Sequence, residues 1–309
     1  MLLKGLFNDS SAWVQFIVFL ALIIGGMIGC TLITQLLIVI RFGLSPEVIE
    51  HVITNLIHYP ELIRNIQFFQ GVIAFIFPSI ICAWLFSDNY KSYLKADVSI
   101  NIPTVGLTIL SIIIFIPFIN WTQIINQQLV LPEWLEGLEK WMQAQEETNA
   151  EILKKMLYSK TIWTLLFNIL IVCILTGIGE EFIFRGILQN IFGRAIKNPH
   201  IVIWLVAIIF SAIHLQFYGF IPRMLLGAYF GYLLLYTRNI WMPVIAHITH
   251  NLINVIGFYI YQDSPHMESE LDTLGVGDTS WLALASFALF VFIFMQIKQR
   301  GPKSQSFSS

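Results

Sequence analysis

The sequence of 309 residues has little charge: only 12% of its residues are Asp, Glu, Lys or Arg, whereas 57% are hydrophobic. A soluble domain carries about 25% charged residues, so this scarcity excludes an ordinary soluble protein. The net charge of −2 lacks the basic excess that binds nucleic-acid phosphates. With a mean hydropathy of +0.74, the composition indicates an integral membrane protein that is surrounded by the lipid bilayer and binds no nucleic acid.

Cysteine is also scarce, and familiar protease motifs are absent. Cys30, Cys82 and Cys173 all lie in hydrophobic runs without CxxC spacing, which excludes a disulfide framework or a thiolate metal site. We interpret them as small core residues. The sequence contains no HExxH and no GxSxG, and its apolar runs contain no Ser/Lys or Asp/Asp pair. The common zinc, serine and aspartyl protease patterns therefore do not apply.

Long apolar runs dominate what is present. A helix that crosses a bilayer needs about 20 apolar residues, and the first and fourth runs exceed this, so we expect them to tilt or extend beyond the lipid. The fold class predicted is all-α, a polytopic transmembrane helical bundle of about eight spans at residues 13–40, 66–87, 103–122, 161–192, 200–216, 221–237, 240–261 and 280–297.

The basic residues of the loops predict the orientation. An even number of spans places both termini on one side of the membrane, and cytoplasmic termini put more Lys and Arg inside, including the basic tail Lys298–Lys303. The first run lacks a small-residue cleavage site, so we expect a membrane helix rather than a signal peptide. The short loops and the chain length are typical of a multi-pass protein of a prokaryotic inner (plasma) membrane.

The segment between the third and fourth spans has an amphipathic pattern. Trp134, Leu135, Leu138, Trp141 and Met142 recur at helical spacing, with Glu residues on the other face. This pattern suits a helix that lies in the membrane interface, over the entrance to a site. A solvated connecting helix fits the pattern equally well.

The fourth span contains two adjacent carboxylates and an arginine in the run Gly179-Glu180-Glu181-Phe182-Ile183-Phe184-Arg185-Gly186. An ionisable group at the centre of a bilayer costs at least about 2.5–3.5 kcal/mol and by default indicates a functional site. Glu181 and Arg185 are four residues apart, so they can pair on one helix face, whereas Glu180 projects about 100° away. A carboxylate in an apolar cavity binds its proton more tightly, as a general base working near neutrality requires. The alternative is a buried structural ion pair with a spare carboxylate.

Polar residues recur in two later spans. Phe210 and His214 lie four residues apart near the end of the fifth, and the seventh contains His247, His250 and Asn251. A lone histidine in an apolar helix is more often a hydrogen-bonded helix contact than a catalyst. Two imidazoles and an amide in one span are costly unless they face a polar cavity. We therefore predict that these residues and Glu180 converge on a buried polar cavity.

Two kinds of chemistry suit such a cavity. Glu and His can activate a water molecule, while His and Asn can donate hydrogen bonds to a developing oxyanion, which describes an amide hydrolase. Alternatively, Glu180, His214 and His247 could form a metal set of two histidines and a carboxylate, for which zinc is the candidate cofactor.

Three motifs carry a family resemblance: EExxxR (Glu180, Glu181, Arg185), FxxxH (Phe210, His214) and HxxxN (His247, Asn251). In this order on successive helices they resemble the CPBP family, which comprises type II CAAX prenyl proteases and bacteriocin-processing or Abi-like membrane proteins. The resemblance covers roughly residues 160–256 and divides one membrane domain into three segments. These are N-terminal spans with the interfacial helix at 1–159, a catalytic core at 160–256, and the last span with its basic tail at 257–309.

The resemblance implies an intramembrane endopeptidase that acts on a membrane-associated peptide or protein. It implies Glu180 as the base that activates water, assisted by His214, and His247 and Asn251 as oxyanion donors, while Glu181, Arg185 and Phe210 support the site. Family members are often called metalloproteases, and a metal-free glutamate mechanism is also proposed for them. Two other functions stay open: a non-catalytic scaffold or immunity protein of the same fold, and a transporter, because intramembrane Glu and His also build proton relays.

Overall fold

The structure, a computed structural model, describes residues 3–264 and 273–302 and is helical throughout, with no strand in these two ranges. Within these two ranges, seven helical segments are long and apolar enough to cross a membrane. An eighth apolar helix, α11 (Pro199–Ala212), is shorter. The all-α bundle of about eight spans is thus confirmed. The seven long segments are Ala12–Phe42, Pro60–Phe86, Ile102–Gln127, Ile162–Ala195, Phe217–Thr237, Trp241–Tyr261 and Gly277–Arg300.

Four of these segments are composite. The second consists of α3 (Pro60–Phe69), a π-helical turn (Gln70–Ile76) and α4 (Phe77–Phe86). The fourth consists of α8 (Ile162–Asn168), α9 (Thr176–Glu181) and α10 (Gln189–Ala195), with a π-helical turn between successive helices. The segments Phe217–Thr237 and Gly277–Arg300 each begin with a short 3₁₀ turn. The other principal helices are α1 (Ala12–Phe42), α2 (Pro46–Thr54), α5 (Tyr90–Tyr93), α6 (Ile102–Gln127), α7 (Glu136–Leu157), α12 (Phe220–Thr237), α13 (Trp241–Tyr261) and α15 (Ser280–Arg300).

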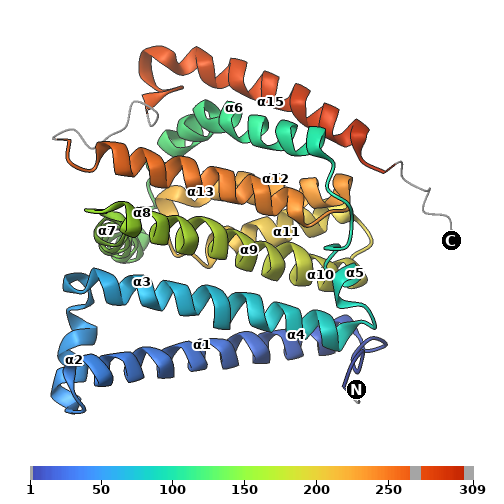
Figure 1. The fold of residues 1–309 in the computed structure, drawn as a ribbon. Coiled ribbons are helices and arrows are strands. Elements are labelled where there is room, and N and C mark those ends of the chain that lie inside the picture. The colour runs from blue at the N-terminus through green and yellow to red at the C-terminus, as the bar shows by residue number, and fades with distance from the viewer. Residues whose placement is uncertain (1–2, 265–272, 303–309) are drawn as a thin grey trace.

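The fourth segment lies in the middle of the bundle (Figure 1). The second segment and α1 pack on one side of it, while α13, α12, α6 and α15 follow on the other. Glycines allow this close packing. A Cβ at Gly177 would lie 2.8 Å from Ile248 of α13, and a Cβ at Gly179 would lie 2.8 Å from Phe75 of the second segment. Small residues bring membrane helices together in this way, here around the predicted site.

Several predicted span ends differ from the structure by up to six residues, and two of these differences change the account of a residue. The second span begins at Pro60 rather than at residue 66, because proline is well suited to the first turn of a helix. Arg64, which the sequence places in a loop, is therefore buried in α3. Its guanidinium donates to the carbonyls of Met156 at 2.9 Å and Tyr158 at 2.8 Å. It thereby attaches the end of α7 to the bundle.

The second difference is the fifth span, which ends at Ala212 rather than at residue 216. Leu215 adopts the left-handed conformation, with φ of 51°, and this turns the chain back toward α12. At about 1.5 Å per residue, α11 is only about 21 Å long, shorter than the ~30 Å hydrocarbon core. The loop after α11 therefore lies at the depth of the site rather than at the far end of the bundle.

The predicted amphipathic helix is present as α7, preceded by a 3₁₀ turn (Glu133–Leu135). Figure 1 shows α7 nearly end-on, across one end of the bundle, whereas the spans run along the bundle. Trp134 and Trp141 are 80% and 48% exposed, which suits burial in a membrane interface. Both described chain ends lie at the opposite end of the bundle.

Candidate active site

Glu180 and Glu181 lie near the middle of the fourth segment, between two π-helical turns. Its parts are α8 (Ile162–Asn168), a π turn (Ile169–Leu175), α9 (Thr176–Glu181), a second π turn (Phe182–Leu188) and α10 (Gln189–Ala195). A π turn inserts an extra residue into the helical repeat and is frequently found at functional sites. Glu180 and Glu181 thus end a short α-helical stretch whose faces are set by the turns on either side.

Glu181 and Arg185 form the predicted ion pair, which is completely buried. Arg185 Nη1 donates to Glu181 Oε1 at 2.9 Å, and both side chains are 0% exposed. Arg185 Nη2 donates to the Gly227 carbonyl of α12 at 2.8 Å. The Arg185 Cζ atom lies 4.7 Å from the centre of the Phe210 ring and 5.4 Å from that of Phe230. The arginine charge is therefore stabilised by a carboxylate, a carbonyl and aromatic faces.

The same carboxylate oxygen also holds a histidine. His247 Nδ1 lies 2.8 Å from Glu181 Oε1 and donates to it, because a carboxylate oxygen paired with arginine is an acceptor. The Phe230 ring stacks on the imidazole with centroids 5.2 Å apart. Glu181 thus fixes the orientation of the His247 ring and turns Nε2 toward Glu180, an arrangement that the spacing of the residues did not predict.

His214 reaches Glu180 because α10 and α11 form a hairpin in which the two residues lie at matching positions. Glu180 lies 15 residues before Ala195, and His214 lies 15 residues after Pro199 across the intervening turn, so the two residues have similar depths in this helical hairpin. His214 Nδ1 donates to the Phe210 carbonyl at 2.7 Å. This bond is the contribution of Phe210 to the FxxxH motif, together with the packing of its ring against His214 at 5.1 Å.

Glu180 faces both imidazoles. Its Oε1 lies 3.9 Å from His214 Nε2 and its Oε2 lies 3.8 Å from His247 Nε2. These distances are too long for direct hydrogen bonds. Both Nδ1 atoms already donate their protons elsewhere, so in the neutral imidazoles both Nε2 atoms are acceptors. Two nitrogen lone pairs and an ionised carboxylate would then surround one small space, which a hydrogen-bond donor such as water would satisfy.

The zinc alternative does not fit this arrangement. Among the residues that the structure describes, no group of three or more His, Cys, Asp and Glu side chains could hold a metal ion. Ligands about 2.0–2.1 Å from a tetrahedral zinc ion lie roughly 3.3 Å apart, closer than the 3.8 and 3.9 Å between Glu180 and the two imidazoles. The donor set therefore does not match a tetrahedral zinc site with Glu180, His214 and His247.

Asn251 lines the same cavity, but one N–H of its side-chain amide bonds to the backbone of the fourth segment. Its Nδ2 donates to the Val172 carbonyl, in the first π turn, at 2.9 Å. One of the two amide N–H groups is thus used to join α13 to the fourth segment, and the second remains for another acceptor. The cavity, of about 330 Å³, brings all four predicted catalytic residues together: Glu180, His214, His247 and Asn251.

The cavity has a second polar wall that the motifs did not identify. Asn120 and Gln123 of α6, Arg223 of α12, and His250 and Asn254 of α13 line it as well. Amides and a guanidinium in apolar spans follow the rule that led to Glu180, so their residue types were a usable signal. The sequence predicted that His250 shares the cavity with Glu180, but it gave no sign that Asn120 and Gln123 do, because α6 lies far away in sequence.

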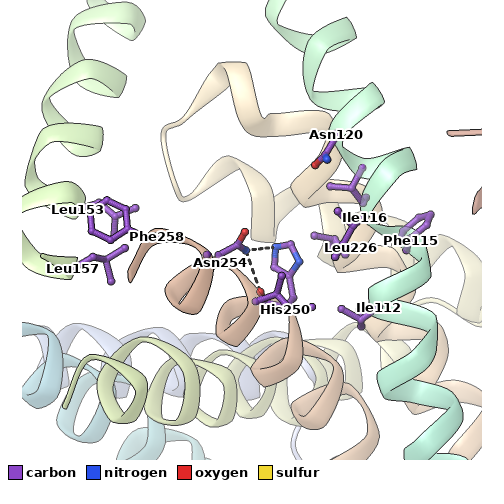
Figure 2. A pocket seen from close by; sticks show the side chains of 13 residues that line it. Ile112, Phe115, Ile116, Asn120, Leu153, Leu157, Leu226, His250, Asn254 and Phe258 are labelled. Atoms are coloured by element: carbon purple, nitrogen blue, oxygen red, sulfur yellow. Dashed lines mark hydrogen bonds between the residues drawn. The ribbon is translucent and has the colours of Figure 1, made fainter. Parts of the chain in front are cut away.

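The cavity continues into a second one of about 340 Å³ between α6, α7 and α13. Figure 2 shows His250 and Asn254 pointing toward one another there, with Asn254 Nδ2 3.3 Å from His250 Nε2. Leu153 of α7 and Phe115 of α6 form part of its apolar walls. The polar site thus extends beneath α7, which agrees with the predicted position of this helix over the entrance.

A third cavity reaches Glu180 and His214 from the opposite side. It has a volume of about 560 Å³, and apart from these two residues and two glutamines its walls are apolar, with α1 contributing Phe16, Leu20 and Met27 among others. Glu180 and His214 therefore lie where a polar cavity and an apolar cavity meet.

Comparison with known proteins supports the resemblance of the motifs. Residues 162–253 match the family described as Type II CAAX prenyl endopeptidase Rce1-like. The match contains all three motifs and indicates a peptidase. Searches of curated proteins and of solved structures gave no match. Together with the seven apolar helices, the family match identifies an integral, multi-pass membrane protein with a peptidase-like core.

Proposed function

We propose that this protein is an intramembrane endopeptidase that hydrolyses a peptide bond in a membrane-associated peptide or protein. The observation that carries the proposal is the position of Glu180 opposite two imidazole Nε2 atoms in one membrane-depth cavity. The Glu180 carboxylate and the acceptor Nε2 of neutral His214 bind a water molecule through the two protons of that water. Glu180 and His214 together then hold a water molecule and can remove its proton.

The reaction proceeds as an acyl transfer to water. Glu180 accepts a proton from the water as the oxygen attacks the carbonyl carbon of the scissile bond. The resulting tetrahedral intermediate carries a negative oxygen. Glu180 or His214 returns the proton to the peptide nitrogen, the carbon–nitrogen bond breaks, and a carboxylate and an amine leave the site.

The oxyanion is assigned to His247 and Asn251. Asn251 Nδ2 has a second N–H after its bond to Val172. His247 donates to the oxyanion from Nε2 after it has taken up a second proton from solvent before the reaction, and Glu181 Oε1 accepts from its Nδ1 at 2.8 Å. Glu181 and Arg185 therefore act as positioning residues for His247, and preorganised donors of this kind lower the barrier by about 2.7–4 kcal/mol each.

The test is cleavage of a membrane-peptide library by detergent-purified wild type and Glu180→Gln, each with and without a metal chelator. We expect chelator-resistant cleavage by the wild type and none by the isosteric variant. The exposed carboxylate Glu147 of α7 provides a matched control, since Glu147→Gln removes the same charge outside the cavity. Near wild-type cleavage by Glu180→Gln would reject Glu180 as the base, and chelator-sensitive cleavage would reject the metal-free chemistry. Peptide binding that survives Glu180→Gln, without cleavage by the wild type, would favour the scaffold.

A further inference from the structure

A basic pocket lies far from the candidate active site, at the end of the bundle where α12 and α15 end. Its volume is about 860 Å³, and none of the described residues that line it is acidic. Three of them are cationic: Lys95 from the loop after α5, Arg238 directly after α12, and Lys298 in the last turn of α15. In Figure 1 these elements meet at the end that also contains both described chain ends.

The three cations have no anionic partner in the described part of the chain. Within residues 3–264 and 273–302, no side-chain hydrogen bond or ion pair joins Lys95, Arg238 or Lys298 to another residue. Lys298 Nζ lies 4.8 Å from the centre of the Tyr236 ring, in a cation–π contact. Burial and the neighbouring Arg238 lower the pKa of Lys95 below its ordinary value. This cluster therefore repels itself unless an anion binds to it.

The backbone at this pocket is strained and held in place. Lys95 and Arg238 have φ values of 56° and 51°, a left-handed conformation that is uncommon for residues with a side chain. The Lys95 carbonyl accepts from the Ile240 N–H at 3.2 Å. Asn239 Nδ2 donates to the Val98 carbonyl at 3.2 Å. Strained residues that the surrounding structure fixes in this way cluster at ligand-binding sites.

The C-terminal side of the pocket is also fixed. A Cβ at Gly301 would lie 2.0 Å from the Tyr236 carbonyl oxygen, so only glycine allows the end of α15 to pack this closely on the end of α12. Beside the cations, Leu235 and Met295 supply an apolar wall, and Met295 is 53% exposed. The pocket thus combines a cluster of three cations with an apolar wall that continues along α12 and α15.

We infer that this pocket binds the headgroup of an anionic phospholipid, with its phosphodiester at Lys95, Arg238 and Lys298 and its acyl chains beside α12 and α15. The cations match the charge of the phosphodiester, and the ends of two spans place them where headgroups lie. Basic pockets between membrane helices bind anionic headgroups. A free phosphate ion would satisfy the cations but leave the apolar wall unused, so we assign the lipid.

The experiment is native mass spectrometry of the full chain in detergent, titrated with dioctanoyl phosphatidylglycerol or, as the neutral control, dioctanoyl phosphatidylcholine. We expect one tightly retained molecule of the anionic lipid and none of the neutral lipid. The variant Lys95→Gln/Arg238→Gln/Lys298→Gln should bind the anionic lipid at least about tenfold more weakly, since each cation contributes to headgroup attraction. Its matched control is Lys4→Gln/Lys91→Gln/Lys197→Gln, which removes the same charge from exposed residues outside the pocket and should bind like wild type.

Three results would overturn the inference. The first is equal binding by the pocket variant and wild type, and the second is equal weakening in the matched control, which would indicate a general effect of charge. The third is displacement of the lipid by millimolar inorganic phosphate, which would identify a phosphate site instead. Should the triple variant fail to fold, Lys298→Gln alone alters an exposed side chain at a helix end and should weaken binding several-fold. Unchanged binding in that variant would count against the pocket.

Discussion

Glu180 and Glu181 are adjacent in the chain, yet they lie in two different regions of the site. Glu181 belongs to a closed region in which it and Arg185 are 0% exposed. Glu180 belongs to the cavity region, where its side chain is 13% exposed and that of His214 is 27% exposed. In the closed region, Glu181 Oε1 contacts both Arg185 and His247, although Glu181 Oε2 and Arg185 Nε are buried without a hydrogen-bond partner. The cavity region instead leaves space beside Glu180 for water or a substrate.

His247 joins the two regions. Its Nδ1 is held by Glu181 in the closed region, and its Nε2 faces Glu180 in the cavity. Substitutions in the cavity region and in the closed region should therefore affect different measured properties. Changes in the cavity region should impair cleavage and leave folding intact, and changes in the closed region should reduce stability first.

The largest effect is expected in the cavity region. His214→Ala should reduce kcat/KM by about 10²–10⁴, the usual contribution of a general acid or base, and leave the thermal unfolding temperature nearly unchanged. The measurement is cleavage of whichever library peptide the wild type hydrolyses. His200→Ala is the control, because His200 is exposed and contacts Tyr232 Oη at 3.0 Å, outside the cavity. Cleavage by His214→Ala at the level of the control would remove His214 from the reaction.

Substitutions in the closed region should lower the stability of the protein. Arg185→Ala leaves Glu181 buried without its cation, and breaking a buried pair in this way costs about 3–5 kcal/mol. The measurement is unfolding of the purified protein by a denaturing detergent.

The chain supplies its own control for this prediction. Arg41 and Glu61 form a pair at 3.1 Å whose side chains are 53% and 64% exposed. Exposed pairs contribute about 0–1 kcal/mol, so Arg41→Ala should have little effect. Equal losses of stability in the two variants would contradict the assignment of Arg185 to a closed, desolvated region.

The difference between the regions also explains what the sequence could predict. Glu181 and Arg185 are local neighbours, so the helical repeat was enough to predict their pair. The 15-residue arms that bring Glu180 and His214 together extend from the turn between α10 and α11. The end of the fifth span is instead set where Leu215 adopts a left-handed conformation. No glycine or proline at that position signals the turn. The apolar run therefore predicted an end of the fifth span that lies too far along the chain, although it correctly predicted that Glu180 and His214 lie within apolar spans.

Contacts between segments that are distant in the chain could not be predicted from a single sequence. The bond from Asn251 to the Val172 carbonyl depends on a π turn, and π turns have no recognisable residue pattern. The approach of Asn120 and Gln123 to the cavity depends on how α6 packs on α12 and α13. The residue types indicate a polar site, and the motifs identify four of its residues. Which other polar side chains line the same cavity can be learned only from how the helices pack.

The smallest predicted effect concerns the glycine that allows the closed region to form. The Gly227 carbonyl accepts from Arg185 Nη2 at 2.8 Å, and a Cβ at Gly227 would lie 3.1 Å from Phe210 and 3.3 Å from Arg185 Nη2. Gly227→Ala should therefore crowd Arg185 and reduce stability by about 1–3 kcal/mol, as overpacking of a filled core does. The detergent unfolding measurement again applies.

Gly106→Ala on α6 is the matched control, because nothing lies within 4 Å of a Cβ at Gly106. Alanine is favoured over glycine in a helix by up to about 1 kcal/mol, so this variant should be as stable as wild type or more stable. If Gly227→Ala leaves the stability unchanged, the Arg185 side chain can move away from the added methyl group without loss of stability. The closed region would then be less rigid than its contacts imply. A loss at Gly227 with cleavage reduced in proportion to folded protein would instead show that α12 acts on the reaction only by holding Arg185, Glu181 and His247 in place.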